Sequence, residues 1–407
     1  MLLGLFPGTL FSAPIFFPEA ELDAPFLSFK GGLVSLGAEM EAEFLEPKGD
    51  DDIPFTNGDE SVFHTNQSVA KFRLDKVTLI PQLNINDKIR FYAEIEAYAN
   101  RADAETTIFR EAALSFFLPH DLFIQMGLDD RFISPEFMAD NGAVGENKRL
   151  TDSYPINGTA FWEDEDLGLT VGGNHAFDGE KTRLFWRLSF TNGLNLDHDE
   201  ITRNRIFPIL ADDRDANIIN LDVSDKKELG SGIGVKRTFS DAYNVGLFGF
   251  FYYSRLSGQD VDFLIHVIPG YSHRKHMNYF AGANAEFNAS KFNLFSQYIY
   301  AMDGKVRRDG FYVQPSVLFE TDKRKYVNAF RLLYRFNYLD VDAAGVSRNL
   351  SASPFTWDRR THTAAFNIQI HKLLTFRNEF HWNLEKTGGS PKRIKNDEFL
   401  SQIELRF

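Results

Sequence analysis

The sequence predicts an all-β protein: a transmembrane antiparallel β-barrel of about 16 strands, with short periplasmic turns and long extracellular loops. Three observations predict this fold. Apolar and polar residues alternate in many separate segments, which is the period of a strand with one apolar face. The 407 residues include 41 phenylalanines, although the mean hydropathy is −0.29. Short turns and longer polar stretches separate the alternating segments.

The last segment, residues 396–407, alternates clearly and ends on an aromatic residue. Its apolar parity holds Phe399, Ile403, Leu405 and Phe407, and its mainly polar parity holds Leu400, Gln402, Glu404 and Arg406. We expect a strand here that has a partner on both edges, which a closed barrel provides. The alternative is an edge strand of a soluble β-sandwich.

The other strands are placed by the same alternation. In chain order, the expected strands are 36–44, 70–83, 88–98, 106–118, 122–128, 167–174, 182–191, 229–239, 243–253, 279–287, 292–300, 311–319, 326–338, 362–370, 375–385 and 396–407. Strand 36–44 sets Glu39, Glu41 and Glu43 opposite apolar residues, and three carboxylates on one face are tolerable beside a water-filled lumen.

The connections between these strands differ in length. Tight turns are expected at 84–87, 119–121, 177–180 and 240–241, where Asn, Asp, Gly, Pro or Ser residues occur, and at Lys372. Acidic stretches such as 46–61 and 192–226 are expected as outer loops. Residues 259–277 are ambiguous: DFLIHVI reads as a strand, but counting it gives an odd total, so we place 259–277 in an outer loop.

Composition excludes several classes of function. No stretch approaches the roughly 20 apolar residues of a spanning helix. The chain has no cysteine, which excludes disulfides, thiolate metal sites, iron–sulfur clusters and c-type haem attachment. A net charge of −13 makes nucleic acid an unfavourable partner. We expect no metal site and no cofactor.

The N-terminal segment is apolar and is interrupted by Gly and Pro. Residues 1–20 resemble the end of a secretory signal peptide, although no basic residue precedes Lys30. An ordinary apolar segment is the alternative. We therefore expect a signal-peptide remnant over 1–20 and a single barrel over 21–407.

Three stretches of the chain resemble one family of outer-membrane channels. They are FIQMGLDDRFISPEF at 123–137, WRLSFTNG at 186–193 and DGFYVQPSVLFE at 309–320. Together with the C-terminal hairpin, they resemble the phosphate-selective porin O/P family over roughly 72–407. The resemblance implies a barrel of about 16 strands, a homotrimer and an inward-folded loop that narrows the pore. No series of basic residues matches the basic ladder of the phosphate-specific members.

Charged residues at two places are candidates for lining the pore. Residues 129–157 are the expected constriction loop, which begins with Asp129, Asp130, Arg131 and Glu136. Strand parity places the other candidates inside the barrel: Lys88, Arg90, Glu94, Glu96, Arg183, Arg187, Arg331, Arg335 and Arg377. Opposed charges across a narrow opening set the ion preference of a pore, whereas plain solvated lumen residues are the alternative.

These observations predict a porin in the outer membrane of a Gram-negative bacterium, in contact with outer-membrane lipid and passing small hydrophilic solutes or ions. Two alternatives stay open: a barrel sheath around a periplasmic or lipoprotein partner, and an anion- or phosphate-selective channel. The early glutamates and acidic loops favour weak cation selectivity. An enzyme is not expected, because His371, His381 and Ser401 lack a nucleophile elbow.

Overall fold

The computed structural model describes the strands and many of their connections. The described residues are 27–29, 33–47, 71–86, 88–98, 107–130, 165–179, 181–193, 224–240, 242–267, 271–321, 327–343, 357–371, 374–387, 393–394 and 397–406. The expected signal remnant over 1–20, most of the expected constriction loop, and Phe407 lie outside the described residues.

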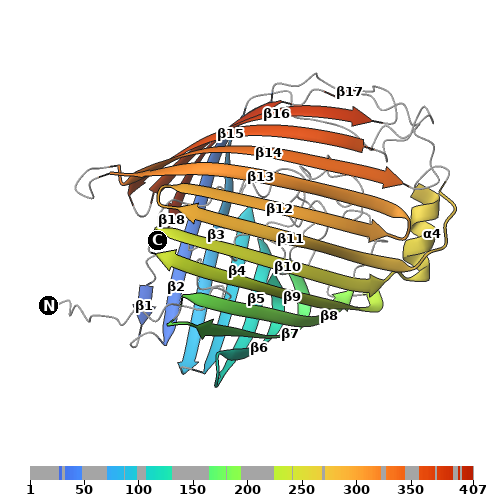
Figure 1. Ribbon diagram of the computed structural model, residues 1–407, viewed down its shortest axis with the longest axis horizontal. Helices are drawn as coiled ribbons and strands as arrows, with labels where there is room; N and C mark the ends of the chain where they lie inside the picture. Colours follow the sequence, from blue (N-terminus) through green and yellow to red (C-terminus); the bar gives the residue numbers. More distant parts are fainter. Residues whose placement is uncertain are drawn as a thin grey trace.

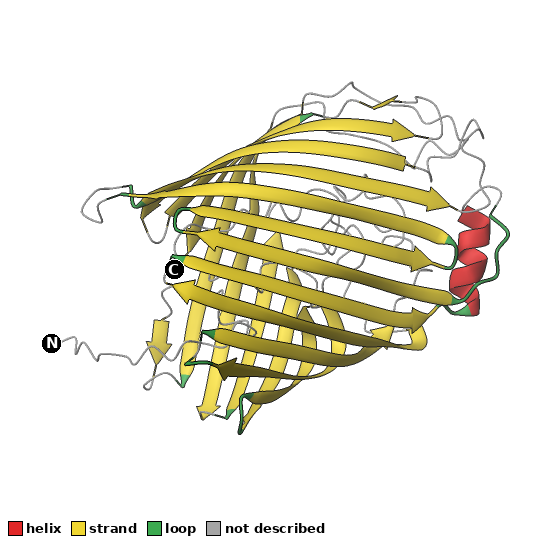
Figure 2. Cartoon of the chain, viewed as in Figure 1, coloured by secondary structure: helices red, strands yellow, loops and turns green. Residues whose placement is uncertain are grey.

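The described chain is almost entirely antiparallel sheet (Figures 1 and 2). The strands are β1 (Leu27–Phe29), β2 (Val34–Pro47), β3 (Lys71–Asn86), β4 (Ile89–Tyr98), β5 (Thr107–Leu118), β6 (Leu122–Asp130), β7 (Glu165–Phe177), β8 (Thr182–Gly193), β9 (Ser224–Ser240), β10 (Tyr243–Arg255), β11 (Met277–Ala289), β12 (Phe292–Asp303), β13 (Val306–Glu320), β14 (Ala329–Ala343), β15 (Trp357–His371), β16 (Leu374–Thr387), β17 (Arg393–Ile394) and β18 (Glu398–Arg406). The helix α4 (Gly258–Val267) lies between β10 and β11.

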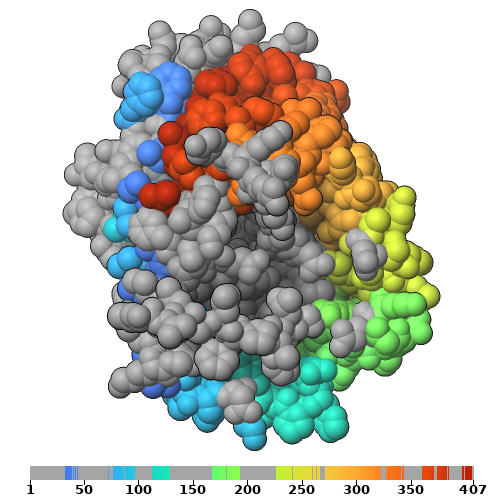
Figure 3. Space-filling model, turned by 90° about the vertical axis from the view of Figure 1, so that its left-hand side faces the viewer, coloured from blue at the N-terminus to red at the C-terminus, as the bar shows by residue number. Residues whose placement is uncertain are grey.

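The sheet closes on itself. It contains 18 strands, of which β1 and β17 are short additions to β2 and β16. The other 16 each pair with two neighbours, and the last strand pairs with the first through Ser401 and Phe44 at its centre. Figure 3, seen from the end that carries the termini in Figure 1, shows the red and blue ends of the sequence side by side. The predicted barrel is confirmed.

The two ends of the barrel carry connections of different length. The end with the termini carries 87–88, 119–121, 178–181, 241–242, 290–291, 321–328 and 372–373. The opposite end carries 48–70, 99–106, 131–164, 194–223, 256–276, 304–305, 344–356 and 388–397. In the β7–β8 turn, the Lys181 N–H donates to the Asp178 carbonyl at 3.3 Å, and Asp178 and Gly179 have φ of 52° and 61°, in the left-handed region that glycine adopts readily. The predicted asymmetry is therefore present, with 304–305 as a tight turn among the longer loops.

Burial alternates along each strand with the period of two. In β10, Phe248, Phe250 and Tyr252 are buried, whereas Leu247, Phe251 and Tyr253 on the other parity are exposed. Most large side chains on the exposed parity are apolar, as a lipid-facing surface requires, although charged residues such as Arg237 and Arg307 also lie on it. The buried parity carries most of the buried polar and charged side chains. Within the described residues, no helix is long and apolar enough to span a membrane.

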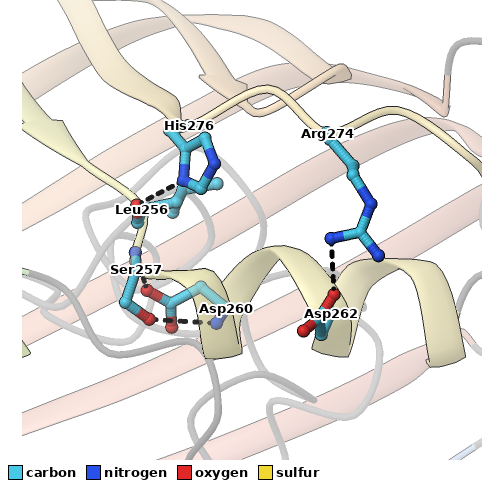
Figure 4. Close-up of polar contacts among 6 residues, drawn as sticks. All are labelled: Leu256, Ser257, Asp260, Asp262, Arg274 and His276. Atoms are coloured by element: carbon cyan, nitrogen blue, oxygen red, sulfur yellow. Dashed lines mark hydrogen bonds and ion pairs between the residues drawn. The ribbon is translucent and has the colours of Figure 1, made fainter.

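The ambiguous segment 259–277 contributes a helix to the barrel's outer end. α4 begins after Ser257, whose hydroxyl accepts the Asp260 N–H at 3.0 Å while the Asp260 carboxylate accepts the Ser257 N–H at 2.6 Å. This reciprocal cap fixes the helix start, so the run DFLIHV at 262–267 is helical instead of extended (Figure 4). Val261 and Leu264 on its inner side are fully buried. The segment is therefore an outer loop with a helix, and β11 begins at Met277.

Candidate functional site: the charged lumenal wall

The lumenal parity of the later strands carries arginines that are paired. Arg308 on β13 donates to Asp303 at the end of β12, with a separation of 2.6 Å and side-chain exposures of 0% and 1%. The two-residue turn at 304–305 brings these strand ends together. Arg335 on β14 lies over the ring of Tyr312 on β13, with its guanidinium carbon 3.7 Å from the ring centre. Each buried cation is thus held by a carboxylate or an aromatic face.

A second group lies on β15, β16 and β18. Arg377 forms an ion pair with Glu404 and donates to the Gln402 side-chain oxygen at 3.0 Å. Nearby, His381 Nε2 lies 3.0 Å from Glu379 Oε2, and His381 Nδ1 lies 2.9 Å from the Thr363 hydroxyl. All of these side chains are buried.

The register joins the two groups into one row across the wall. Arg335 pairs with Thr363 on β15, Thr363 pairs with His381 on β16, and His381 pairs with Glu398 on β18. Paired residues of an antiparallel sheet share a face. Arg335, Thr363, His381 and Glu398 are therefore neighbouring positions on one face of the sheet.

Smaller polar groups lie on the earlier strands. On β4, Arg90 donates to Asn84 at 2.8 Å and lies over Phe117, while the Tyr92 hydroxyl donates to Glu94 at 3.2 Å. On β8, Arg187 donates to Gln125 of β6 at 3.4 Å and lies 5.6 Å from the Phe123 ring centre. Arg90 and Arg187 therefore each contact one amide oxygen and one aromatic ring.

The predicted pore-lining residues are spread over several sectors of the barrel. Arg335 and Arg377 are buried on the lumenal parity, as are Arg187 and Glu94. Arg90, Arg183 and Arg331 are half-buried. Glu96 lies in β4, opposite Thr78, and Asp129 and Asp130 end β6, opposite Asp166 and Glu165. Arg131 and Glu136 lie outside the described residues.

Lys88 differs from the expected placement on a strand. It lies in the β3–β4 turn and is exposed. The Asn86 side chain accepts the Lys88 N–H at 2.8 Å, which closes the turn before the strand starts at Ile89. Lys88 is thus at the rim with the short turns.

The early glutamates and the late arginines share one wall of the barrel. β2 is hydrogen-bonded to β18, and the register pairs Glu39, Glu41 and Glu43 with Arg406, Glu404 and Gln402. Closure sets Arg377 on the second strand from Glu41, with β18 between them, because a closed sheet makes its first and last strands neighbours.

The wall opposite this seam carries aromatic rings. Going around the ring of paired strands, β8 to β11 lie on the far side from β16, β18, β2 and β3. Phe185, Phe248, Phe250, Tyr252 and Phe280 are buried on the lumenal parity here. Tyr252 and Phe280 stack, with ring centres 4.8 Å apart. The aromatic residues are therefore not confined to the lipid-facing surface of the barrel.

Glycines on neighbouring strands make room for these rings. A Cβ added to Gly234 on β9 would lie 2.1 Å from the Phe185 ring, and one added to Gly282 on β11 would lie 2.3 Å from the Phe250 ring. The large rings consequently lie over strands that have no side chain at the point of contact.

Sequence reasoning missed Arg308, Asp303 and Tyr312. The expected strand began at Phe311, whereas β13 begins at Val306 and continues the same parity through Arg308. The alternation of VRRDGFYV was the available signal, but Arg307 and Asp309 on the other parity obscured it. Within the described ranges, no group of three or more His, Cys, Asp or Glu residues is placed to hold a metal ion.

Comparison with solved structures relates this architecture to known barrels. The chain is similar to OmpF of Salmonella typhi in complex with daunomycin, with a TM-score of 0.57, 11% identity and coverage of 92% of this chain and 97% of that one. It is similar to OprB of Pseudomonas putida, with a TM-score of 0.55, 10% identity and coverage of 92% and 94%. The outer-membrane channel DcaP of Acinetobacter baumannii gives 0.53, 12%, and coverage of 93% and 99%.

This is the porin fold. At such low identity the likeness extends to the fold alone. No family model and no curated protein matches the sequence. The similar solved structures include outer-membrane proteins of Gram-negative bacteria.

Proposed function

We propose that the chain is an outer-membrane porin that passes small hydrophilic solutes or ions. The observation that carries the proposal is the closed ring of 16 strands whose exposed face is apolar and whose lumenal parity is rich in charged side chains. An apolar exterior with a polar interior is the arrangement that a water-filled pore requires. The similar solved structures include proteins named as channels and porins, which supports the same function.

Finer parts of the proposal rest on the sequence. The resemblance to the phosphate-selective porin O/P family supports membership in that family, a homotrimer, and a constriction loop over 129–157. The pairing of Arg308 and Arg377 with carboxylates argues against a tight phosphate site on the later strands. A guanidinium group that already binds a carboxylate offers less to a passing anion.

The first prediction is conductance. Purified, folded protein added to a planar lipid bilayer should give discrete, ohmic current steps, because an open aqueous lumen passes ions at any voltage sign. Heat-denatured protein in the same detergent is the control and should give none. Sealed bilayers containing folded protein would contradict the proposal. A second protein that co-purifies in equal amount with a sealed barrel would instead support the sheath.

The second prediction is the ion preference of these steps. We expect weak cation selectivity at about 0.1 M salt that fades towards 1 M, because the Debye length falls from roughly 10 Å to 3 Å. The net charge of −13 and the glutamate positions on β2 favour cations, whereas the paired arginines contribute little net field. The reversal potential under a salt gradient measures this preference. An anionic sign at low salt, or block by micromolar phosphate, would contradict it.

A further inference from the structure

Amide side chains gather on the lumenal parity of β10, β11 and β12, near the end of the barrel that carries the termini. The Asn288 side-chain N–H group donates to the Asn244 side-chain oxygen at 2.7 Å and also to the Glu286 carboxylate. The Asn293 side-chain N–H group donates in turn to the Asn288 side-chain oxygen. Hydrogen bonds therefore join polar side chains from three neighbouring strands.

An aromatic residue lies beside these amides. On β12, Phe295 comes two residues after Asn293. The register pairs Phe295 with Glu286 of β11 and with Gln314 of β13. Because paired residues share a face and Glu286 is buried on the lumenal parity, Phe295 also lies on that parity. Phe295 is only half-buried, so part of it stays accessible from the lumen.

Unused hydrogen-bond acceptors lie next to Phe295 in the described part of the chain. Among the residues that the structure describes, the Asn293 Oδ1 and Gln314 Oε1 atoms are buried and accept no hydrogen bond. A buried acceptor without a donor is unfavourable, and a ligand that brings a donor relieves this cost. On β10, Gly246 pairs with Glu286, so this position adds no side chain beside the carboxylate. The wall thus presents acceptors next to an aromatic surface.

We propose that these side chains form a sugar-binding patch, an inference that rests on the proposed porin function and names the class of solute. The sugar-binding patch consists of Asn244, Glu286, Asn288, Asn293, Phe295 and Gln314. A pyranose ring carries hydroxyl groups around its edge and C–H bonds on its faces. The hydroxyl groups donate to amide and carboxylate oxygens and accept from amide N–H groups, while a C–H face packs against an aromatic ring.

The chemistry of the sugar-binding patch favours an uncharged solute. Glu286 is the one carboxylate of the patch, and its negative charge disfavours an anion. The side-chain N–H groups of Asn288 and Asn293 are donors, which disfavour a cation. An apolar surface with a few placed polar groups is the usual form of a small-molecule site, and hydroxyl groups match donors and acceptors together.

Ion current through the pore measures sugar binding, because a sugar held in the lumen obstructs ions while it stays bound. D-glucose is added to planar bilayers that contain the full-length protein. Triethylene glycol, an uncharged solute of similar size with few hydroxyl groups, is added in parallel. We expect glucose to lower the conductance to a plateau, which gives a half-blocking concentration, and triethylene glycol to lower it only in proportion to viscosity. A glucose effect without a plateau, or the same plateau with triethylene glycol, would overturn the proposal.

The variants F295L and Q314L locate the site, because each keeps an apolar side chain of similar size and breaks none of the hydrogen bonds given above. We expect each variant to raise the half-blocking concentration of glucose about fivefold, since it removes either the aromatic surface or one amide contact. Unchanged half-blocking concentrations in both variants would contradict the assignment of the site.

F117L is the matched control, because it removes a lumenal ring from another part of the wall. Phe117 pairs with the buried Phe123, lies under the Arg90 guanidinium group, and belongs to β5, across the ring of strands from β12. The control should be blocked by glucose as the wild type is. A loss in F117L equal to that in F295L would mean that the effect does not come from the sugar-binding patch.

Saturation-transfer NMR separates failure of the site from failure of the proposed function. Protein folded in detergent is mixed with glucose, and transfer of saturation from the protein to the C–H protons of the sugar is recorded without any ion flow. Transfer that F295L and Q314L weaken, in a protein that gives no current steps, would support the site and contradict the porin function. Ohmic steps with neither block nor transfer by glucose would support the function and contradict the site. Heat-modifiability shows that each variant is folded.

Discussion

Replacing Arg377 with methionine is expected to lower the free energy of unfolding by about 3–5 kcal/mol. The substitution leaves Glu404 buried with a side-chain exposure of 1% and without the guanidinium group that now pairs with it. Gln402 also loses the donor that reaches its oxygen at 3.0 Å. A buried carboxylate without its cation is far less stable than the intact pair.

The measurement is urea unfolding of the protein in lipid vesicles, followed by tryptophan fluorescence. Arg274→Met is the matched control, because the same change breaks an ion pair with Asp262 whose side chains are 70% and 65% exposed. We expect a change of under about 1 kcal/mol there. The double variant R377M/E404M should recover most of the loss, since no buried charge is left unpaired. Wild-type stability in R377M would contradict the assignment of a buried ion pair.

Replacing Gly234 with alanine is expected to destabilise the barrel by about 1–3 kcal/mol. The new Cβ would lie 2.1 Å from one atom of the Phe185 ring and 2.8 Å from the Leu247 carbonyl oxygen. Phe185 is 1% exposed and cannot simply swing aside, and the carbonyl belongs to a paired strand. The same unfolding experiment measures the loss, and F185L in the G234A background should restore part of it.

Gly249→Ala is the control for this prediction. A Cβ at Gly249 on β10 has only the Gly282 carbonyl oxygen as a neighbour, at 3.8 Å. We expect G249A to be neutral or to stabilise by up to about 1 kcal/mol, because alanine loses less backbone entropy than glycine on folding. If G234A and G249A lower the free energy of unfolding by the same amount, the packing of the lumenal rings does not depend on the glycines of β9.

The barrel could be predicted because its signal is repeated. Alternation in any one segment is weak evidence for a strand. The short turns between segments, however, show which residues of neighbouring strands lie on the same face of the sheet. The Asp178-Gly179 pair marks a turn, since Asp and Gly adopt the left-handed conformation more readily than most residues. By contrast, α4 depends on the cap between Ser257 and Asp260, which an apolar run such as DFLIHVI does not reveal.

The site was less accessible to sequence reasoning than the fold. Parity gives the face of Arg335 and Arg377, and the structure has both on the lumenal parity. Parity does not identify the partners of these two arginines. Glu404 and Tyr312 lie on other strands, and the register between strands is known only from the structure of the sheet. The lumenal ring of Phe185 was hidden because it lies between Arg183 and Arg187 on a parity that is otherwise polar. The rings have room because β9 has glycines beneath them, and the alternation of apolar and polar residues gives glycine no weight.

The glycines of β9 also bear on the order in which the barrel folds. Gly230, Gly232 and Gly234 occupy successive lumenal positions of one strand, so β9 has little intrinsic preference for the extended state. It gains most of its order from β8 and β10, whose rings Phe185 and Tyr252 would meet a Cβ at Gly234 and Gly230. We expect β9 to become ordered only after its neighbours are in place, which makes it the joint between an early-forming and a late-forming half of the barrel.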